Sequence, residues 1–194
     1  MPVHLIIKLN KMKRLFFAVT ITFLFAAAGR AQRIFTKNGL ISFFSHTTME
    51  DIKADNNQVL CVLNTQTGEL QFSILNKGFH FKKAGMEEHF NEDYIESSKF
   101  PKSAFKGIVT DFSKINFTKD GTYPVTVKGD LTIHGVTKNI LTPGNVNVKD
   151  GKVNVTSKFT AKLADYNISI PGAVKNNISP TIEITVNCSL DQKM

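Results

Sequence analysis

Residues 123–140 read YPVTVKGDLTIHGVTKNI, and their pattern is that of a β-hairpin. Apolar and polar residues alternate along 123–134, which is typical of a strand with one apolar and one wet face. The apolar set is Tyr123, Val125, Val127, Leu131 and Ile133. The alternation breaks at His134 and Gly135, and a second β-prone run begins at Val136. The pattern therefore predicts two strands joined at a His-Gly turn.

Most of the chain beyond this hairpin also has the pattern of strands. Further strands are predicted over residues 40–46, 58–64, 69–75, 103–116 (as one or two pieces), 153–163 and 181–190. Residues 47–57, the region of Pro143 and Gly144 up to 149, and residues 165–179 are predicted as loops. About eight strands without βαβ alternation leave an antiparallel barrel or a sandwich. The chain has no Trp, which disfavours an immunoglobulin-type sandwich. We therefore predict an all-β fold, an eight-stranded antiparallel barrel.

One segment, residues 84–97, has helical rather than strand periodicity. Met86, Phe90 and Tyr94 follow one another at intervals of four, which places them on one helical face. The acidic residues of the segment lie on the other side: Glu87, Glu88, Glu92 and Asp93. Pro101 prevents any continuation. We expect one short amphipathic helix across the end of the sheet.

The first 31 residues have the pattern of a secretory signal. Basic residues precede a largely apolar run over 15–28, and small residues follow it near 29–31. A retained membrane anchor is the alternative, but this run is shorter than the roughly 20 residues that span a bilayer. We predict a signal peptide over 1–31, or over 12–31 if translation starts at Met12, and one domain over 32–194. The mature protein would be periplasmic or secreted.

The positive charge of the chain is concentrated in this leader. Five of the 24 basic residues and none of the 16 acidic ones lie in 1–31, so the remainder carries +3 rather than +8. No long basic run is left, and we expect no nucleic-acid partner. The two cysteines, Cys61 and Cys188, lie on the apolar phases of their strands and are interpreted as buried thiols. Export would also permit a disulfide, and the sequence leaves that open.

Motifs that carry catalysis are missing from the sequence. It contains no Gly-x-Ser-x-Gly, phosphate-binding glycine loop, His-Glu-x-x-His or Cys-x-x-Cys. His80 and His89 flank the start of the helix without the paired spacing of metal ligands. His134 is expected to hydrogen-bond local backbone at its turn. We predict no catalytic residue, no metal and no cofactor, the alternative being an enzyme that acts on a lipid with His134 or His80 as base.

The chain is richer in phenylalanine than the core of a small filled barrel requires. These side chains either simply build the core or line an elongated apolar cavity that takes a lipid chain, with the helix near its mouth. The predicted cavity wall consists of Phe43, Phe72, Ile74, Phe79, Phe81, Met86, Phe90, Phe105, Val125, Val127, Leu131, Ile133 and Phe159.

Two separate motifs resemble those of the YceI-like family. Residues 131–138, LTIHGVTK, are similar to its signature hairpin. The elements Met-x-x-His-Phe-Asn at 86–91 and Phe-Pro-x-x-x-Phe-Lys-Gly at 100–107 are similar to its helix and the following strand. The resemblance extends from about residue 32 to 190. The chain departs from the family pattern at 83–86 and 163–166, where a polar head group would be held.

The resemblance implies an extended lipocalin-like barrel with a long apolar cavity. It further implies non-covalent binding of an isoprenoid, quinone, fatty-acid derivative or other long-chain amphiphile, and no enzymatic activity. Transient membrane contact and a monomeric or homodimeric state are compatible with this role. A third hypothesis is a stress-response interaction module whose cavity is vestigial.

Overall fold

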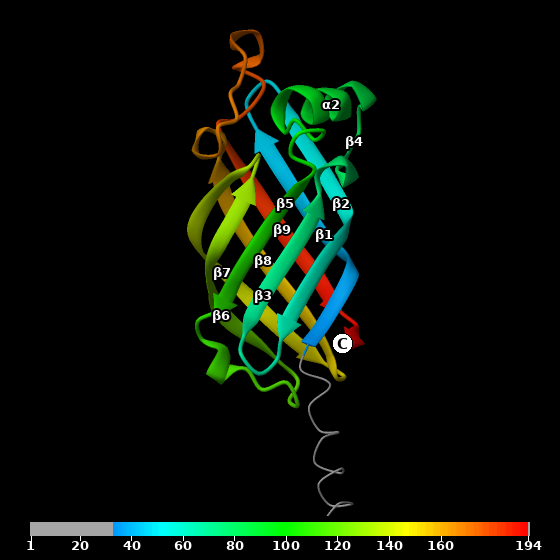
Figure 1. Ribbon diagram of the computed structural model, residues 1–194, viewed down its shortest axis with the longest axis vertical. Helices are drawn as coiled ribbons and strands as arrows, with labels where there is room; N and C mark the ends of the chain where they lie inside the picture. Colours follow the sequence, from blue (N-terminus) through cyan, green and yellow to red (C-terminus); the bar gives the residue numbers. More distant parts are fainter. Residues whose placement is uncertain (1–32, 194) are drawn as a thin grey trace, which may run out of the picture.

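Eight long strands close into an antiparallel barrel in the computed structural model, which describes residues 33–193 (Figure 1). They are β1 (Arg33–His46), β2 (Asp51–Asn64), β3 (Glu69–Leu75), β5 (Lys102–Val109), β6 (Gly121–Ile133), β7 (Val136–Lys149), β8 (Lys152–Lys162) and β9 (Thr181–Leu190). Their order around the barrel is β1-β9-β8-β7-β6-β5-β3-β2, and the β1–β2 pairing closes the ring. Two-residue strands, β4 (His80–Phe81) and β10 (Gln192–Lys193), are appended to it. The predicted fold class is confirmed.

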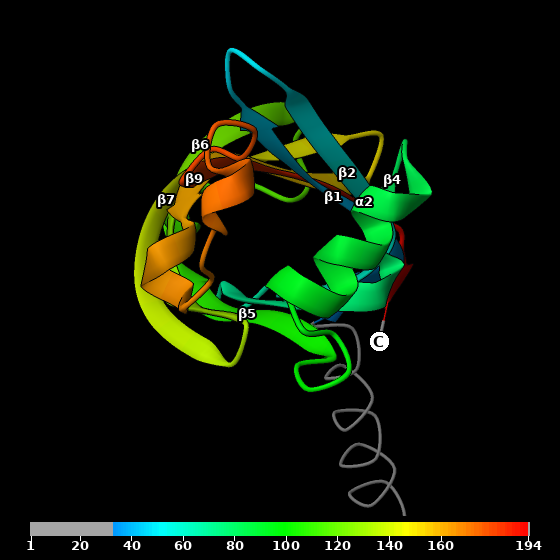
Figure 2. The same cartoon turned by 90° about the horizontal axis from the view of Figure 1, so that it is seen from above.

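Short helical elements gather mainly at one end of the barrel, the upper end in Figure 1. They are η1 (Asn76–Gly78), α2 (Ala84–His89), the π-helical turn η2 (Phe90–Tyr94), η4 (Leu163–Tyr166) and η5 (Gly172–Val174), while η3 (Phe112–Lys114) lies at the lower end. Seen from above, α2 with η2 and the segment that carries η4 lie on opposite sides of the barrel mouth (Figure 2). The predicted amphipathic helix is thus present as α2 continued by η2, and it ends at Tyr94 rather than at residue 97.

The hairpin predicted from residues 123–140 is formed by β6 and β7. Ile133 pairs with Val136 across the turn, where His134 (φ 51°) and Gly135 (φ 72°) are both left-handed. Such a two-residue turn matches the natural twist of antiparallel strands. The loop predicted around Pro143 and Gly144 is wrong, because β7 continues to Lys149. Pro143 stands just beyond the last β7–β8 pair, where its missing N–H costs no hydrogen bond on that side.

The predicted loop over 47–57 is also wrong in its second half, since β2 begins at Asp51. Ala54 and Asn56 point inward there and are fully buried, whereas alternate residues face solvent. Asn56 is accommodated because its amide nitrogen donates to the Leu75 carbonyl (2.9 Å). Because Asn56 points inward and the outer face is also polar, residues 51–57 lack the alternation of apolar and polar residues that predicts a strand. Strand β1 likewise begins at Arg33, earlier than the predicted residue 40.

The two cysteines are free, buried thiols that lie close to each other inside the barrel. Cys61 lies on β2 and Cys188 on β9, the two neighbours of β1. Gly39 of β1 leaves the room, since a Cβ there would stand 2.4 Å from the Cys188 sulfur. Burial raises the pKa of the Cys61 thiol.

Candidate functional site

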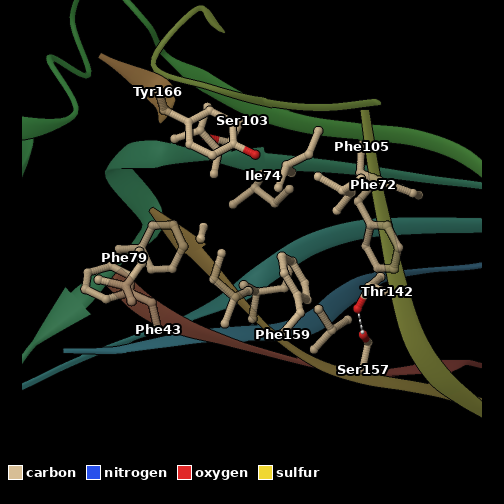
Figure 3. Close-up of a pocket in the computed structure, with 18 of the residues that line it drawn as sticks. Phe43, Phe72, Ile74, Phe79, Ser103, Phe105, Thr142, Ser157, Phe159 and Tyr166 are labelled. Carbon is tan, nitrogen blue, oxygen red and sulfur yellow. Dashed lines mark hydrogen bonds between the residues drawn. The ribbon is translucent and has the colours of Figure 1, made fainter. Parts of the chain in front are cut away.

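An apolar cavity of about 420 Å³ occupies the barrel and extends to its upper end, where Met86, Lys162 and Val174 line it. This volume lies within the range of typical ligand pockets, about 300–1,000 Å³. Every residue predicted for the wall lies on it, drawn in part in Figure 3: Phe43, Phe72, Ile74, Phe79, Phe81, Met86, Phe90, Phe105, Val125, Val127, Leu131, Ile133 and Phe159. Whether these side chains contact a ligand stays a prediction.

Strand periodicity explains the position of the β6 side chains. Val125, Val127 and Leu131 are each 7% exposed and face inward, whereas Lys128 and Asp130 of the other phase are exposed. The same alternation carries wall residues around the ring from each of the eight long strands. The part of the wall that the strands supply therefore follows directly from the alternating sequence.

Four phenylalanines form a cluster at the upper end of the cavity: Phe43 of β1, Phe79 between η1 and β4, Phe81 of β4 and Phe90 of η2. The ring of Phe90 in η2 lies 5.5 Å from that of Phe43, 5.6 Å from that of Phe79 and 5.2 Å from that of Phe81. Tilted and edge-on rings at such distances attract one another beyond simple burial. This Phe90 cluster fastens the segment α2–η2, here called the lid, to the barrel rim.

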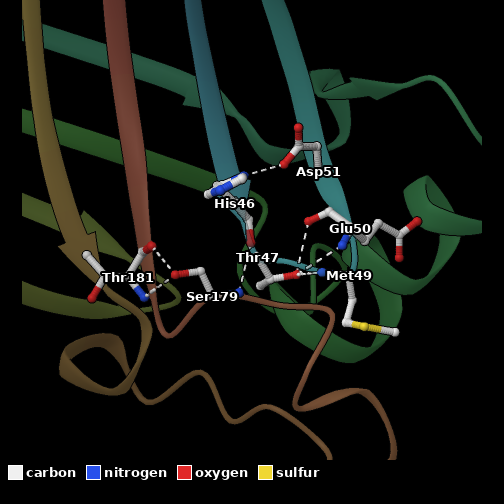
Figure 4. Close-up of polar contacts among 8 residues, drawn as sticks. His46, Thr47, Met49, Glu50, Asp51, Ser179 and Thr181 are labelled. Carbon is white, nitrogen blue, oxygen red and sulfur yellow. Dashed lines mark hydrogen bonds and ion pairs between the residues drawn. The ribbon is translucent and has the colours of Figure 1, made fainter.

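Glu50 connects the lid to the opposite side of the mouth. Its carboxylate accepts hydrogen bonds from Lys83 Nζ (2.9 Å), the residue just before the lid, and from Asn177 Nδ2 (3.3 Å). These two donors hold the pKa of Glu50 below its usual range. The turn that carries Glu50 is held by Thr47, whose hydroxyl oxygen accepts from the Glu50 backbone N–H at 3.0 Å (Figure 4). Nearby, the Ser179 N–H donates to the Ser45 hydroxyl oxygen (2.9 Å) and so ties the 172–180 segment to β1.

His134 makes a second junction at the rim. Its Nε2 lies 2.6 Å from a Glu96 carboxylate oxygen, and its Nδ1 donates to the Tyr166 carbonyl (3.1 Å). The Phe100 ring packs edge-on against the imidazole with ring centres 4.5 Å apart. The bond to His134 lowers the pKa of Glu96. The backbone partner of His134 is thus 32 residues away, not local as predicted.

Strands β7 and β8 part above their last pair, Gly144 with Ser157. Thr142 and Ser157 line the cavity there, and the Ser157 hydroxyl donates to the Pro143 carbonyl (2.7 Å). The cavity wall thus contains a few neutral polar groups among its apolar side chains, as ligand pockets do.

His80 and His89 do not converge on the cavity as a catalytic or metal centre. His80 lies 3.5 Å from Glu87 and His89 lies 2.9 Å from Asp93, and all but Glu87 of these residues are exposed. Within residues 33–193 no three side chains of His, Cys, Asp or Glu are grouped to hold a metal ion.

The interpretation of the sequence missed the contribution of the loops to the cavity. Ile168, Val174 and Ile178 line it from a segment predicted only as irregular. Tyr166 also lines it, at 4% exposure, within the 163–166 stretch where the chain departs from the family pattern. Nothing in a non-periodic loop indicates which side chains fold back over a barrel mouth, because that depends on distant contacts.

Comparison of the chain with known proteins identifies its family. The model of the YceI-like domain matches residues 30–190. The chain belongs to the YceI-like family. A search of curated protein sequences finds no match. No helix within residues 33–193 has the length and apolarity needed to cross a membrane.

Solved structures support the same fold at low sequence identity. A polyisoprenoid binding domain from Saccharophagus degradans is 17% identical, with a TM-score of 0.72 over 82% of this chain and 98% of that one. BcnA of Burkholderia cenocepacia is 13% identical, with a TM-score of 0.65 over 78% and 95%. The YceI protein of Campylobacter jejuni is 17% identical, with a TM-score of 0.55 over 77% and 88%. All three share the architecture of the YceI-like family.

Proposed function

We propose that this protein binds a long-chain amphiphile, such as an isoprenoid, quinone or fatty-acid derivative, non-covalently in its barrel cavity. The observation that carries the proposal is the apolar cavity of about 420 Å³, which the lid lines at the barrel mouth. The similar domain from Saccharophagus degradans is described as polyisoprenoid binding, which supports a ligand of this class.

The energetics suit a carrier that must release its ligand. Burying one methylene contributes about 0.8 kcal/mol, so a chain of a dozen methylenes is strongly driven out of water. A bilayer offers a similar gain, and association itself costs several kcal/mol. The preference of the ligand for protein over membrane is therefore small, which favours reversible exchange.

The function is binding rather than catalysis. Both ring nitrogens of His134 are engaged by Glu96 and the Tyr166 carbonyl, so it is not placed as a free base. His80 is exposed at the rim. The export signal over residues 1–31 lies outside the described residues, and we propose on its sequence pattern that the domain acts in the periplasm or outside the cell.

Two measurements test the binding proposal. Mass spectrometry of an organic extract of the purified protein should detect a co-purified long-chain lipid. The uncharged dye N-phenyl-1-naphthylamine should gain fluorescence on binding to the delipidated protein.

Val127→Phe, which fills the cavity, should weaken dye binding at least tenfold. The matched variant Thr126→Phe, on the outer face of the same strand, should leave it unchanged. A protein with no extractable lipid and no dye binding, or equal effects of both variants, would contradict the proposal.

A further inference from the structure

Tyr166 presents an unusual polar group to the cavity. Its side chain is 4% exposed and lines the cavity wall, and Figure 3 shows its hydroxyl directed into the cavity. That hydroxyl makes no hydrogen bond with any residue from 33 to 193. Among the described residues, the one fully enclosed side-chain N or O atom without a partner is Asn91 Oδ1, so the Tyr166 oxygen is open to the cavity. Its proton is therefore available to a molecule that occupies the cavity.

The backbone around Tyr166 is held in place on both sides. Its carbonyl accepts the His134 Nδ1 hydrogen bond (3.1 Å), which anchors the η4 turn to the β6–β7 hairpin. The left-handed Asn167 (φ 57°) ends η4, and the Ile168 N–H donates back to the Leu163 carbonyl (3.1 Å). The phenol is therefore positioned before any ligand arrives, which reduces the ordering cost of binding. Burial also raises the pKa of Tyr166, so its hydroxyl keeps its proton at neutral pH.

Two other hydroxyls of the wall, those of Ser103 and Ser157, already use their protons within the protein. Ser103 donates to the Asn76 side-chain oxygen (2.8 Å), and Ser157 donates to the Pro143 carbonyl (2.7 Å). They offer lone pairs to a ligand, whereas Tyr166 offers a proton. A ligand atom that satisfies Tyr166 must therefore be a hydrogen-bond acceptor.

The charges around the cavity favour a neutral acceptor over an anion. Lys162 and His89, which touch the cavity, are both exposed at its rim. Glu50, on the same rim, is an anion already paired with Lys83. No buried Lys or Arg lines the described wall to neutralise a phosphate or carboxylate. Burying an unpaired anion there would be far more costly than burying a carbonyl.

We propose that the Tyr166 hydroxyl donates a hydrogen bond to a neutral carbonyl oxygen of the bound long-chain molecule, such as a ketone, ester, amide or quinone. This assignment rests on the proposed function and adds to it the chemistry of the polar end of the ligand. Tyr166 is then a binding residue that selects carbonyl-bearing chains over plain hydrocarbons and over fatty anions.

A comparison of ketones with an alkane, each bound to the wild type and to Tyr166→Phe, tests this assignment. Affinities of 2-tridecanone, 7-tridecanone and tridecane are measured by displacement of N-phenyl-1-naphthylamine from the wild type and from Tyr166→Phe. At least one ketone should bind about three- to tenfold more weakly to the variant, the value of one neutral hydrogen bond, with tridecane unchanged. Tyr123→Phe is the matched control, because its hydroxyl donates to the Lys119 carbonyl (3.0 Å) near the lower end. It should change none of the affinities.

The infrared spectrum of the bound ketone gives a second readout. The carbonyl band would not differ between the wild type and Tyr166→Phe if Tyr166 had only a structural role. The carbonyl band should lie at lower frequency in the wild type than in Tyr166→Phe. Equal carbonyl frequencies and equal ketone affinities in the wild type and in Tyr166→Phe would overturn the assignment. So would the fatty anion dodecanoate, measured in the same displacement assay, if it bound the wild type as tightly as the better ketone does. If the wild type binds neither ketones nor tridecane, the proposed function fails and this assignment with it. Binding of tridecane with no Tyr166 effect on either ketone overturns the assignment alone.

Discussion

At the tip of the β6–β7 hairpin, one imidazole and one glycine connect three segments that are distant in sequence. His134 contacts Glu96 after the lid and the backbone of Tyr166 in η4, while the Phe100 ring covers Gly135. His134 (φ 51°) and Glu96 (φ 46°) are both non-glycine residues in the left-handed region. Such conformations cost of order 1 kcal/mol or more each and persist only where surrounding contacts impose them. The His-Gly turn is thus a structural junction of the mouth.

The contact at Gly135 can be separated from its backbone strain. Gly135→Ala places a Cβ at 2.4 Å from the Phe100 ring, in addition to the strain of φ 72°. Gly151 has the same φ of 72° in the β7–β8 turn, but a Cβ added there would have no neighbour within 4 Å. We expect Gly151→Ala to lower the free energy of unfolding by about 1 kcal/mol, and Gly135→Ala to lower it by about 1–3 kcal/mol more. Urea titrations give both values. Equal losses of unfolding free energy in the two variants would show that the Phe100 ring moves aside at no cost in stability.

At the scale of elements, the lid is a short helix that depends on the barrel for its stability. α2 has six residues and no side-chain cap at its N-terminus, and a helix of this length is not stable alone. Its attachments include the Phe90 cluster, the Lys83–Glu50 ion pair, the Glu96–His134 contact and the bond from the Phe81 N–H to the Glu87 carboxylate (3.1 Å). Motions of the lid relative to the barrel therefore depend on a small number of contacts at the rim.

Removal of the Phe90 ring should loosen the lid selectively. We expect Phe90→Ala to reduce the free energy of unfolding by about 1–3 kcal/mol, less than a fully buried phenylalanine because Phe90 is half-buried. Amide hydrogen exchange should accelerate over residues 84–95 but not over β6. Phe44→Ala, on the outer face of β1 and absent from the cavity wall, is the control and should leave exchange in 84–95 unchanged. Uniform acceleration across both segments would mean that the lid opens only when the barrel unfolds.

At the scale of the whole molecule, closure depends on β1, which pairs with both β2 and β9. Cys61 and Cys188 stand inside this junction and are both fully buried. Reagents can reach them only when the wall opens, and the raised pKa of the Cys61 thiol slows its reaction further.

Thiol labelling therefore reports on opening of the barrel. We expect both cysteines to react with Ellman's reagent at least about 10³-fold more slowly in the native protein than in guanidinium chloride, with a rate that follows global unfolding. Ser98→Cys, at an exposed position, should add one rapidly reacting thiol. Fast native labelling of the buried pair would indicate a local opening beside β1, and unreactive sulfurs in the denatured protein would indicate a disulfide.

The sequence by itself determined the features that arise from local periodicity. Alternation placed Val125, Val127 and Leu131 on one face, and spacing by four placed Met86 and Phe90 on one side of a helix. These patterns indicated the hairpin, the class of barrel and the side chains of the wall, since the direction of a side chain in a strand or helix depends only on its neighbours along the chain.

The tertiary structure decided the features that depend on distant contacts. The polar stretch over 51–57 became a strand because β1 lies beside it, and Pro143 fitted within β7 because β8 pairs only beyond it. Tyr166 became part of the cavity because its loop folds over the mouth and is held there by His134, 32 residues earlier. Burial and pairing of this kind are properties of the closed barrel, so no local pattern could reveal them.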